Sequence, residues 1–298
     1  MGFSEVLLEE QAPAKTVLVV GASDRKRATR GSDVGGGGAL ESRSGGRILL
    51  TWAIRADDAS ALVLSETSLG GGGGGGAPGS RGARSHCVRV VFPRTLLPMA
   101  CIVDTPPSTA TGPGYAAGEA VASVVVIDSA GTLYRLQMPH SAARAGVAGT
   151  SRSRGGSNES IFVGLSSSDV LAVGDSPALV PLEGPTSIAA VGARLVAVGG
   201  MSGRVAILDV ETLTPVAELK PATLARLWNS IAGARGGQHA IRCLRPVPRG
   251  SAPGAPLLLA ALRADCYLQV WDLTVAARPW SILGVTLPAA PQHEGAAE

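Results

Sequence analysis

One pattern recurs along the chain: an apolar run of β-forming residues, a short polar turn, and a second run that tends to alternate. Regular copies span residues 121–138, 194–210 and 256–273, and a looser copy spans residues 47–64. The first run suits a strand covered on both faces, and the second suits a strand nearer a rim. Hairpins at this spacing are typical of a β-propeller, so we expect an all-β chain, a partial propeller of about three to four blades.

The second run of the last copy shows the alternation most clearly. In a strand, the odd-numbered residues from Tyr267 to Leu273 would share one face and the even-numbered ones the other. The run closes on Trp271 and Asp272. This pair looks like the Trp-Asp ending of a propeller repeat, although a single pair is not diagnostic.

Tracts rich in glycine, serine and arginine interrupt the pattern at residues 25–46, 69–85 and 142–157. The chain holds 40 glycines and 20 prolines, and many of them lie in these tracts. Such segments cannot pack a core, and loops tolerate them because closure entropy grows slowly with length. We therefore expect flexible insertions within one propeller region, residues 1–288, followed by a disordered tail at residues 289–298.

One segment, residues 220–234, departs from the β pattern. Its apolar residues recur at the i, i+3, i+4, i+7 spacing of an amphipathic helix, and Pro221 suits the first turn. We predict one inserted helix, which either docks on the propeller edge or presents a stripe to a partner. The possible partner-binding residues are Leu224, Leu227, Trp228 and Ile231.

Composition excludes several classes of function. The net charge is only +3 and aromatic residues are 3% of the chain, whereas nucleic-acid binding favours clustered cations with stacking aromatics. No apolar run reaches the length of about 20 residues that a membrane span needs. The four cysteines lie far apart, which disfavours a zinc knuckle or a disulfide scaffold and fits a reducing compartment: Cys87, Cys101, Cys243 and Cys266.

No motif predicts an active site. Residues 16–23 resemble the first strand and turn of a nucleotide-binding fold, but the glycine spacing of a phosphate cradle and the following helix are missing. Ser166–Ser168 lack the closing glycine of a nucleophile elbow. The histidines show no paired ligand spacing: His86, His140, His239 and His293. We therefore expect no catalytic residue, no cofactor, no metal and no small-molecule substrate.

The order of several segments resembles a known family. Residues 50–54 lead to 62–64, residues 88–92 are followed by 96–98, and residues 124–127 are followed by 132–136 and then Met138-Pro139-His140. In this order they are similar to the N-terminal region of the hundred-and-sixty-kilodalton nucleoporin family. The predicted helix and the hairpin at residues 257–273 agree with that similarity.

The resemblance implies a structural role in the nuclear pore. Members of this family place an N-terminal β-propeller at one arm of the Y-shaped outer-ring complex, ahead of a long helical solenoid. The chain would then be a fragment with part of the propeller, located at the nuclear envelope. Its partners would be other Y-complex nucleoporins, and the assembly would support transport of protein and messenger RNA. Direct binding to nucleic acid and membrane insertion are not expected.

Two other interpretations stay open. The first is a propeller adaptor with Trp-Asp repeats in another intracellular assembly, although Gly-His and Trp-Asp landmarks do not recur in every unit. The second is a nucleotide-binding enzyme built on residues 17–23. A fold by itself does not fix a function, so the choice among the three depends on the resemblance.

Overall fold

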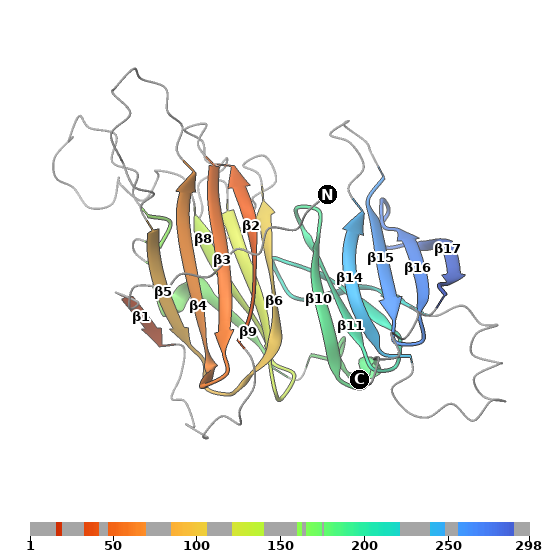
Figure 1. Cartoon of the computed structure of the whole chain (residues 1–298), viewed down its shortest axis with the longest axis horizontal. Helices are drawn as coiled ribbons and strands as arrows, with labels where there is room; N and C mark the ends of the chain where they lie inside the picture. Colours follow the sequence, from red (N-terminus) through yellow and green to blue (C-terminus); the bar gives the residue numbers. More distant parts are fainter. Residues whose placement is uncertain are drawn as a thin grey trace, which may run out of the picture. The chain divides into compact units, whose positions relative to one another are not determined.

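A computed structural model describes residues 16–19, 33–41, 47–69, 85–105, 121–139, 160–162, 165–174, 176–220, 239–247 and 256–288. The chain divides into two compact units, Met1–Ala172 and Val173–Glu298. Each unit contains two β-sheets. Figure 1 shows the strands in the colours of the sequence.

The first unit contains sheets A and B. Sheet A has the strand order β1-β5-β4-β3-β2, and sheet B has the order β6-β7-β8-β9. The strands of sheet A are β1 (Thr16–Val19), β2 (Val34–Glu41), β3 (Arg47–Arg55), β4 (Asp58–Leu69) and β5 (Ser85–Val91). Those of sheet B are β6 (Leu96–Thr105), β7 (Val121–Asp128), β8 (Leu133–Pro139) and β9 (Val170–Val173).

The second unit contains sheets C and D, each with its strands in sequence order. Sheet C consists of β10 (Pro185–Val191), β11 (Leu195–Gly200), β12 (Val205–Asp209) and β13 (Pro215–Leu219). Sheet D consists of β14 (Ile241–Val247), β15 (Leu258–Arg263), β16 (Tyr267–Asp272) and β17 (Trp280–Thr286). The described residues also include two short 3-10 helices, η2 (Ser167–Asp169) and η3 (Val180–Leu182).

Four consecutive strands form the meander of each sheet, and within sheets C and D every neighbouring pair is antiparallel. In both units the first strands of the two sheets lie next to each other, β2 beside β6 and β10 beside β14. Sheets that pack face to face with adjacent first strands are the blades of a β-propeller. The expectation of an all-β propeller with about three to four blades is confirmed, because four such sheets are present.

The recurring hairpins of the sequence are the two middle strands of each sheet. They are β3–β4, β7–β8, β11–β12 and β15–β16. A middle strand is hydrogen-bonded on both edges and, inside a stack of sheets, is covered on both faces, which explains its near-continuous apolar run. In β12, for example, the residues from Val205 to Leu208 are all buried.

Apolar side chains fill the space between the sheets of each unit. In the first unit, Leu50, Leu64 and Val90 of sheet A share one core with Val124 and Val126 of sheet B. In the second unit the buried core joins sheets C and D. It contains Ala189, Val191, Ala197, Val205, Ile207, Leu219, Ile241, Leu244, Leu259, Ala261, Trp271 and Leu273.

The expected insertion at residues 25–46 is wrong in part, because Val34–Glu41 of that tract form strand β2 at the edge of sheet A. Glycine fits this strand for a steric reason. A Cβ on Gly35 would lie 2.8 Å from the carbonyl oxygen of Trp52, and one on Gly36 would lie 2.9 Å from Trp52 Nε1. The Trp52 ring therefore lies against Gly36 and the Trp52 backbone against Gly35, and these contacts with another strand are invisible in the local composition.

Other expectations fall outside the described residues. They are the tract 69–85 apart from its ends in β4 and β5, the tract 142–157, the tail 289–298 and the helix of residues 220–234 beyond Lys220. Thr16–Val19 form the short strand β1, which pairs in parallel with β5 at the edge of an otherwise antiparallel sheet.

The tight turn between β7 and β8 depends on the carboxylate of Asp128, which is fully buried. Its Oδ1 accepts hydrogen bonds from the backbone N–H groups of Ala130 at 2.9 Å and Thr132 at 2.8 Å. The Tyr134 hydroxyl donates to Oδ2 at 3.2 Å. Burial, with the Asp128 charge as a second cause, raises the pKa of Tyr134. The short polar turn expected within residues 121–138 is thus confirmed, and the Asp128 carboxylate stabilises it.

Replacement of Asp128 tests this turn. We expect Asp128→Ala to lower the free energy of unfolding by about 3 kcal/mol, because buried donors lose their acceptor. Asp128→Asn should cost less, since it keeps one acceptor oxygen. Asp57→Ala is the matched control in another turn, where the carboxylate is exposed and its ion pair with Arg55 contributes little. Urea unfolding followed by circular dichroism measures the difference, and equal effects of Asp128→Ala and Asp57→Ala would contradict the assignment.

Candidate interaction surface

Strand β17 differs from the other strands of sheets C and D because all its residues are exposed. It is nevertheless apolar, and the exposed fractions of its large side chains are 65% for Trp280, 51% for Ile282, 47% for Leu283 and 39% for Val285. Exposed apolar residues that lie together mark a surface for contact with other proteins.

A β-bulge gathers most of these side chains on one face of sheet D. Val270 of β16 lies opposite Leu283, but the next residue, Trp271, lies opposite Ser281, so Ile282 is the extra residue. Since side chains alternate between faces, the bulge turns Trp280 to the face that carries Leu283. The same alternation places Val285 there.

The same face continues across the rest of sheet D. Cα pairing aligns Leu268 of β16 with Leu262 of β15, and Leu262 with Cys243 of β14. We call this surface the open face of sheet D. Its half-buried or exposed apolar residues are Val247, Ala260, Leu262, Leu268, Val270, Trp280, Leu283 and Val285.

The opposite face of sheet D is closed. Leu244, Leu259, Ala261 and Trp271 point to that side and are buried in the core shared with sheet C. Gln269 is also buried there, and its Nε2 donates to Ser281 Oγ at 3.2 Å. One face of the sheet is therefore core. The other is also apolar, and apart from Leu258, which is 6% exposed, its apolar residues are half-buried or exposed.

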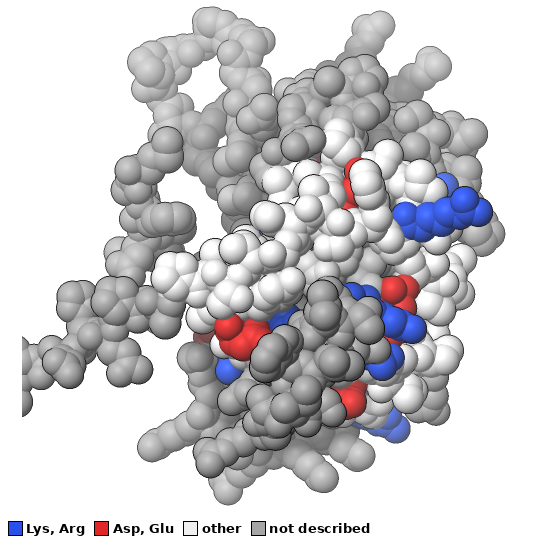
Figure 2. All heavy atoms as spheres, turned by 90° about the vertical axis from the view of Figure 1, so that its right-hand side faces the viewer, with Lys and Arg blue, Asp and Glu red and all other residues white. Residues whose placement is uncertain are grey.

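Figure 2 views the molecule from the side on which β17 lies in Figure 1. A broad area of uncharged atoms is visible there, with lysine, arginine and carboxylate side chains at its margin. An area with few charged residues does not favour a nucleic acid, whose phosphates need cations.

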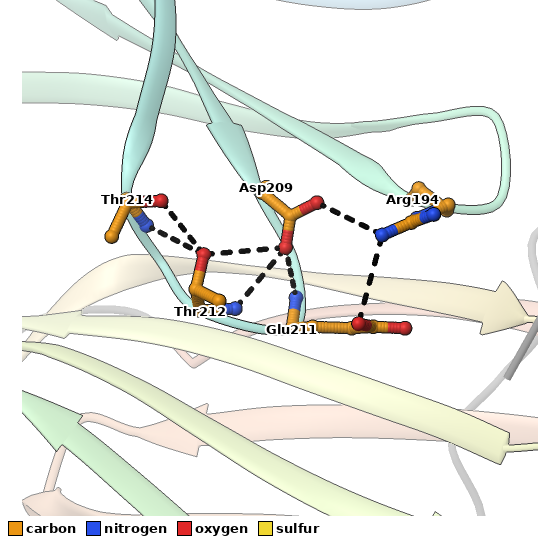
Figure 3. A network of polar contacts seen from close by, with 5 residues as sticks. All are labelled: Arg194, Asp209, Glu211, Thr212 and Thr214. Carbon is orange, nitrogen blue, oxygen red and sulfur yellow. Dashed lines mark hydrogen bonds and ion pairs between the residues drawn. The ribbon is translucent and has the colours of Figure 1, made fainter. Parts of the chain in front are cut away.

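One polar network in sheet C stabilises a turn. Asp209 Oδ1 accepts hydrogen bonds from the backbone N–H groups of Glu211 at 2.9 Å and Thr212 at 3.1 Å (Figure 3). The Thr212 hydroxyl lies 2.7 Å from that of Thr214. Arg194 reaches over from the preceding loop, with Nη2 3.5 Å from Asp209 and 3.6 Å from Glu211. The network closes the β12–β13 turn and ties it to the β10–β11 loop.

A second polar cluster closes the β15–β16 turn. The side chain of Arg263 is 4% exposed, donates to Asp265, contacts His239 Nδ1 and lies over the Tyr267 ring at 5.2 Å. His239 Nδ1 is also 3.3 Å from Asp265 Oδ2. The buried guanidinium is thus neutralised by the carboxylate of its own turn. The cluster joins the start of β14 to the β15–β16 turn.

A buried carboxylate in the first unit also has a structural role. Glu66 of β4 accepts a hydrogen bond from Ser160 Oγ at 2.6 Å and one from the backbone N–H of Ile161 at 3.0 Å. Ile161 and Phe162 belong to the core of that unit. Glu66 therefore links Ser160 and Ile161, which are distant in the sequence, to sheet A by two hydrogen bonds.

The residues singled out in the sequence are only partly placed. The stripe Leu224, Leu227, Trp228 and Ile231 lies outside the described residues, as do His140 and His293. His86 is exposed on β5. Within the part of the chain that the structure describes, no three His, Cys, Asp or Glu side chains form a group that could hold a metal. None of its helices has the length and apolarity to cross a membrane.

Comparison with known proteins gives distant similarities only. No family model matches the chain, and no curated protein does. Among solved structures, the β-propeller domain of Cps50 (Swd1) from Myceliophteria thermophila is 15% identical with a TM-score of 0.35, over 78% of this chain and 50% of that one. BamB from Moraxella catarrhalis is 16% identical with a TM-score of 0.32, over 84% and 52%. The chain spans about half the length of both. The propeller assignment rests on the strand order of the four sheets, and neither likeness transfers a function.

The cysteines of the described residues are free thiols, and Cys101 of β6 is the buried one. Burial raises the pKa of Cys101 to about 12. The folded chain therefore holds the proton of this thiol at a pH where the unfolded chain has lost it. Stability from this group is complete below pH ~9, the ordinary range of a thiol, and declines as the pH rises toward 12.

A pH series tests this burial. We expect Cys101→Ala to remove part of the alkaline loss of stability, up to about 1.4 kcal/mol per pH unit. The matched control is Val125→Ala on the neighbouring strand β7, which removes buried volume next to Cys101 without removing a titrating group. Urea unfolding at pH 8, 9.5 and 11 gives the slopes. Parallel slopes for wild type and Cys101→Ala would contradict the burial.

Proposed function

We propose that this chain is a non-catalytic propeller scaffold that acts through protein–protein contacts. The observation that carries the proposal is the open face of sheet D, an apolar sheet surface on a blade whose other face is already part of a core. A rigid blade presents such a surface without ordering cost, so the binding energy is not spent on folding the site.

The roles of the polar residues support the same proposal. Asp128, Asp209 and Asp265 each stabilise a turn at the end of a hairpin. Glu66 joins a distant segment to its sheet, and Arg263 is paired with Asp265. These groups have assigned structural partners, and no reaction is needed to account for their positions.

The assembly we propose is the outer ring of the nuclear pore, with other Y-complex nucleoporins as partners. The support is the resemblance of residues 50–64, 88–98 and 124–140 to the N-terminal propeller of the hundred-and-sixty-kilodalton nucleoporin family. The stripe Leu224, Leu227, Trp228 and Ile231 is the proposed partner-binding helix. Localisation at the nuclear envelope and a role in transport of protein and messenger RNA belong to the same proposal, as does the absence of catalysis, cofactors and nucleic-acid contact.

A Trp-Asp propeller adaptor in another intracellular assembly is the second candidate. The observation that favours it is the pair Trp271-Asp272 at the end of β16. Trp271 is buried in the core, and Asp272 Oδ1 accepts a hydrogen bond from the backbone N–H of Thr274 at 2.8 Å. Asp209 ends the third strand of sheet C and stabilises its turn in the same way. In sheets C and D, the third strand thus ends on an aspartate that accepts a hydrogen bond from the backbone of the following turn.

Affinity capture from nuclear extract tests the proposal. We expect the immobilised full chain to recover Y-complex nucleoporins, identified by mass spectrometry. The double variant Leu224→Asp/Trp228→Asp should reduce that recovery at least ~10-fold, because charges replace two anchors of a buried contact. Asp57→Ala, a change at an exposed turn, is the control that should recover as much as wild type.

Recovery of the members of one other assembly, with Y-complex nucleoporins absent, would overturn the pore assignment and favour the adaptor. A thermal shift with ATP, GTP or NAD would contradict both scaffold candidates. It would support the nucleotide-binding alternative.

A further inference from the structure

The open face of sheet D carries apolar side chains of the kind that pack against another sheet. Sheet D already packs its other face on sheet C, where Leu259 and Trp271 belong to one buried core with Ile207. Sheets pack face to face about 10 Å apart when apolar side chains interdigitate over a flat area. The open face offers that kind of side chain on all four strands, from Val247 on β14 to Val285 on β17.

The charge on this face is small and of both signs. Arg245 of β14 pairs with Ala260, which places its side chain on the open face. Asp272 of β16 lies opposite Trp280 on the same side. Two copies of this face therefore bring equal numbers of positive and negative charges together. The cation lies on β14 and the anion on β16. In a two-fold contact, where each surface meets its own copy, each copy contributes one such cation and one such anion.

The area agrees with a specific contact. With strands about 4.8 Å apart and a rise of about 3.3 Å per residue, a sheet of four strands covers roughly 20 Å by 20 Å. Corrugated side chains expose more area than this flat footprint. Two such faces together reach roughly the 1,000 Å² that a specific protein interface requires.

We propose that the open face of sheet D binds the open face of a second copy of this chain, so that the protein is a two-fold dimer. The proposal rests on the proposed function, because it names the partner of the surface assigned there. Leu283 and Val285 lie at the apolar part of the contact, and Trp280 becomes buried in it. Residues on both faces of sheet D are then buried, as they are in β12 of sheet C.

Sedimentation velocity of the purified full chain between about 1 and 100 μM tests the dimer, a range that suits an interface of this size. We expect a concentration-dependent dimer and a blue shift of Trp280 emission as it forms. Leu283→Asp should raise the dimer dissociation constant at least ~10-fold, because a charge enters an apolar contact. Leu283→Ser should raise it less. The variants should fold, since Leu283 is 47% exposed.

Val180→Asp is the matched control. Val180 is apolar and 75% exposed, and it lies in η3, outside the open face. The substitution adds the same charge there and should leave the dimer dissociation constant unchanged. A monomer throughout the concentration range overturns the dimer proposal, as does a dimer that Leu283→Asp and Val180→Asp affect equally. Either result is independent of the nuclear extract experiment, which reports on heterologous partners, so failure of the dimer and failure of the pore assignment are distinguishable.

Discussion

Apolar packing between the faces of successive sheets is the interaction on which this molecule depends. An isolated four-stranded meander leaves both faces in water, and its turns and ladders contribute too little to hold it folded. In each unit, two meanders bury one face of each against the other, and the cores contain residues from both sheets. Burial of a large aliphatic side chain contributes about 1.5–3 kcal/mol. The polar turns set the register of the hairpins, and the face-to-face packing supplies the stability.

The same interaction explains why sheet D is the candidate site. A sheet with apolar residues on both faces is stable when both are covered. Sheet D has one face in a core and one whose apolar residues, except Leu258, are half-buried or exposed. The bulge at Ile282 strengthens this asymmetry, because it aims Trp280 at the same side as Leu283. The polar clusters at the turns are already engaged in structure. The apolar face of sheet D is therefore the surface on which the proposed function depends.

Part of this structure could be predicted from the sequence. The middle hairpins were predictable because a covered strand must be apolar along its length, and the turn at Asp128 because aspartate accepts hydrogen bonds from the backbone two residues on. The alternation of β16 is confirmed by burial of Gln269 and Trp271. Strand β2 was missed, because its glycines fit a contact with Trp52 from another strand. The helical stripe at Leu224 stays a prediction. The open face was not predictable, since a pattern of side chains does not tell which face another sheet covers.

Hydrogen–deuterium exchange of the full chain tests the central claim most directly, that sheet faces are closed inside the units and open at sheet D. Amides of buried middle strands such as β12 should exchange only through unfolding of the unit, while those of β17 exchange orders of magnitude faster at low protein concentration. Protection of β17 should then rise with protein concentration. Protection of β17 equal to that of β12 in the dilute chain would contradict the account.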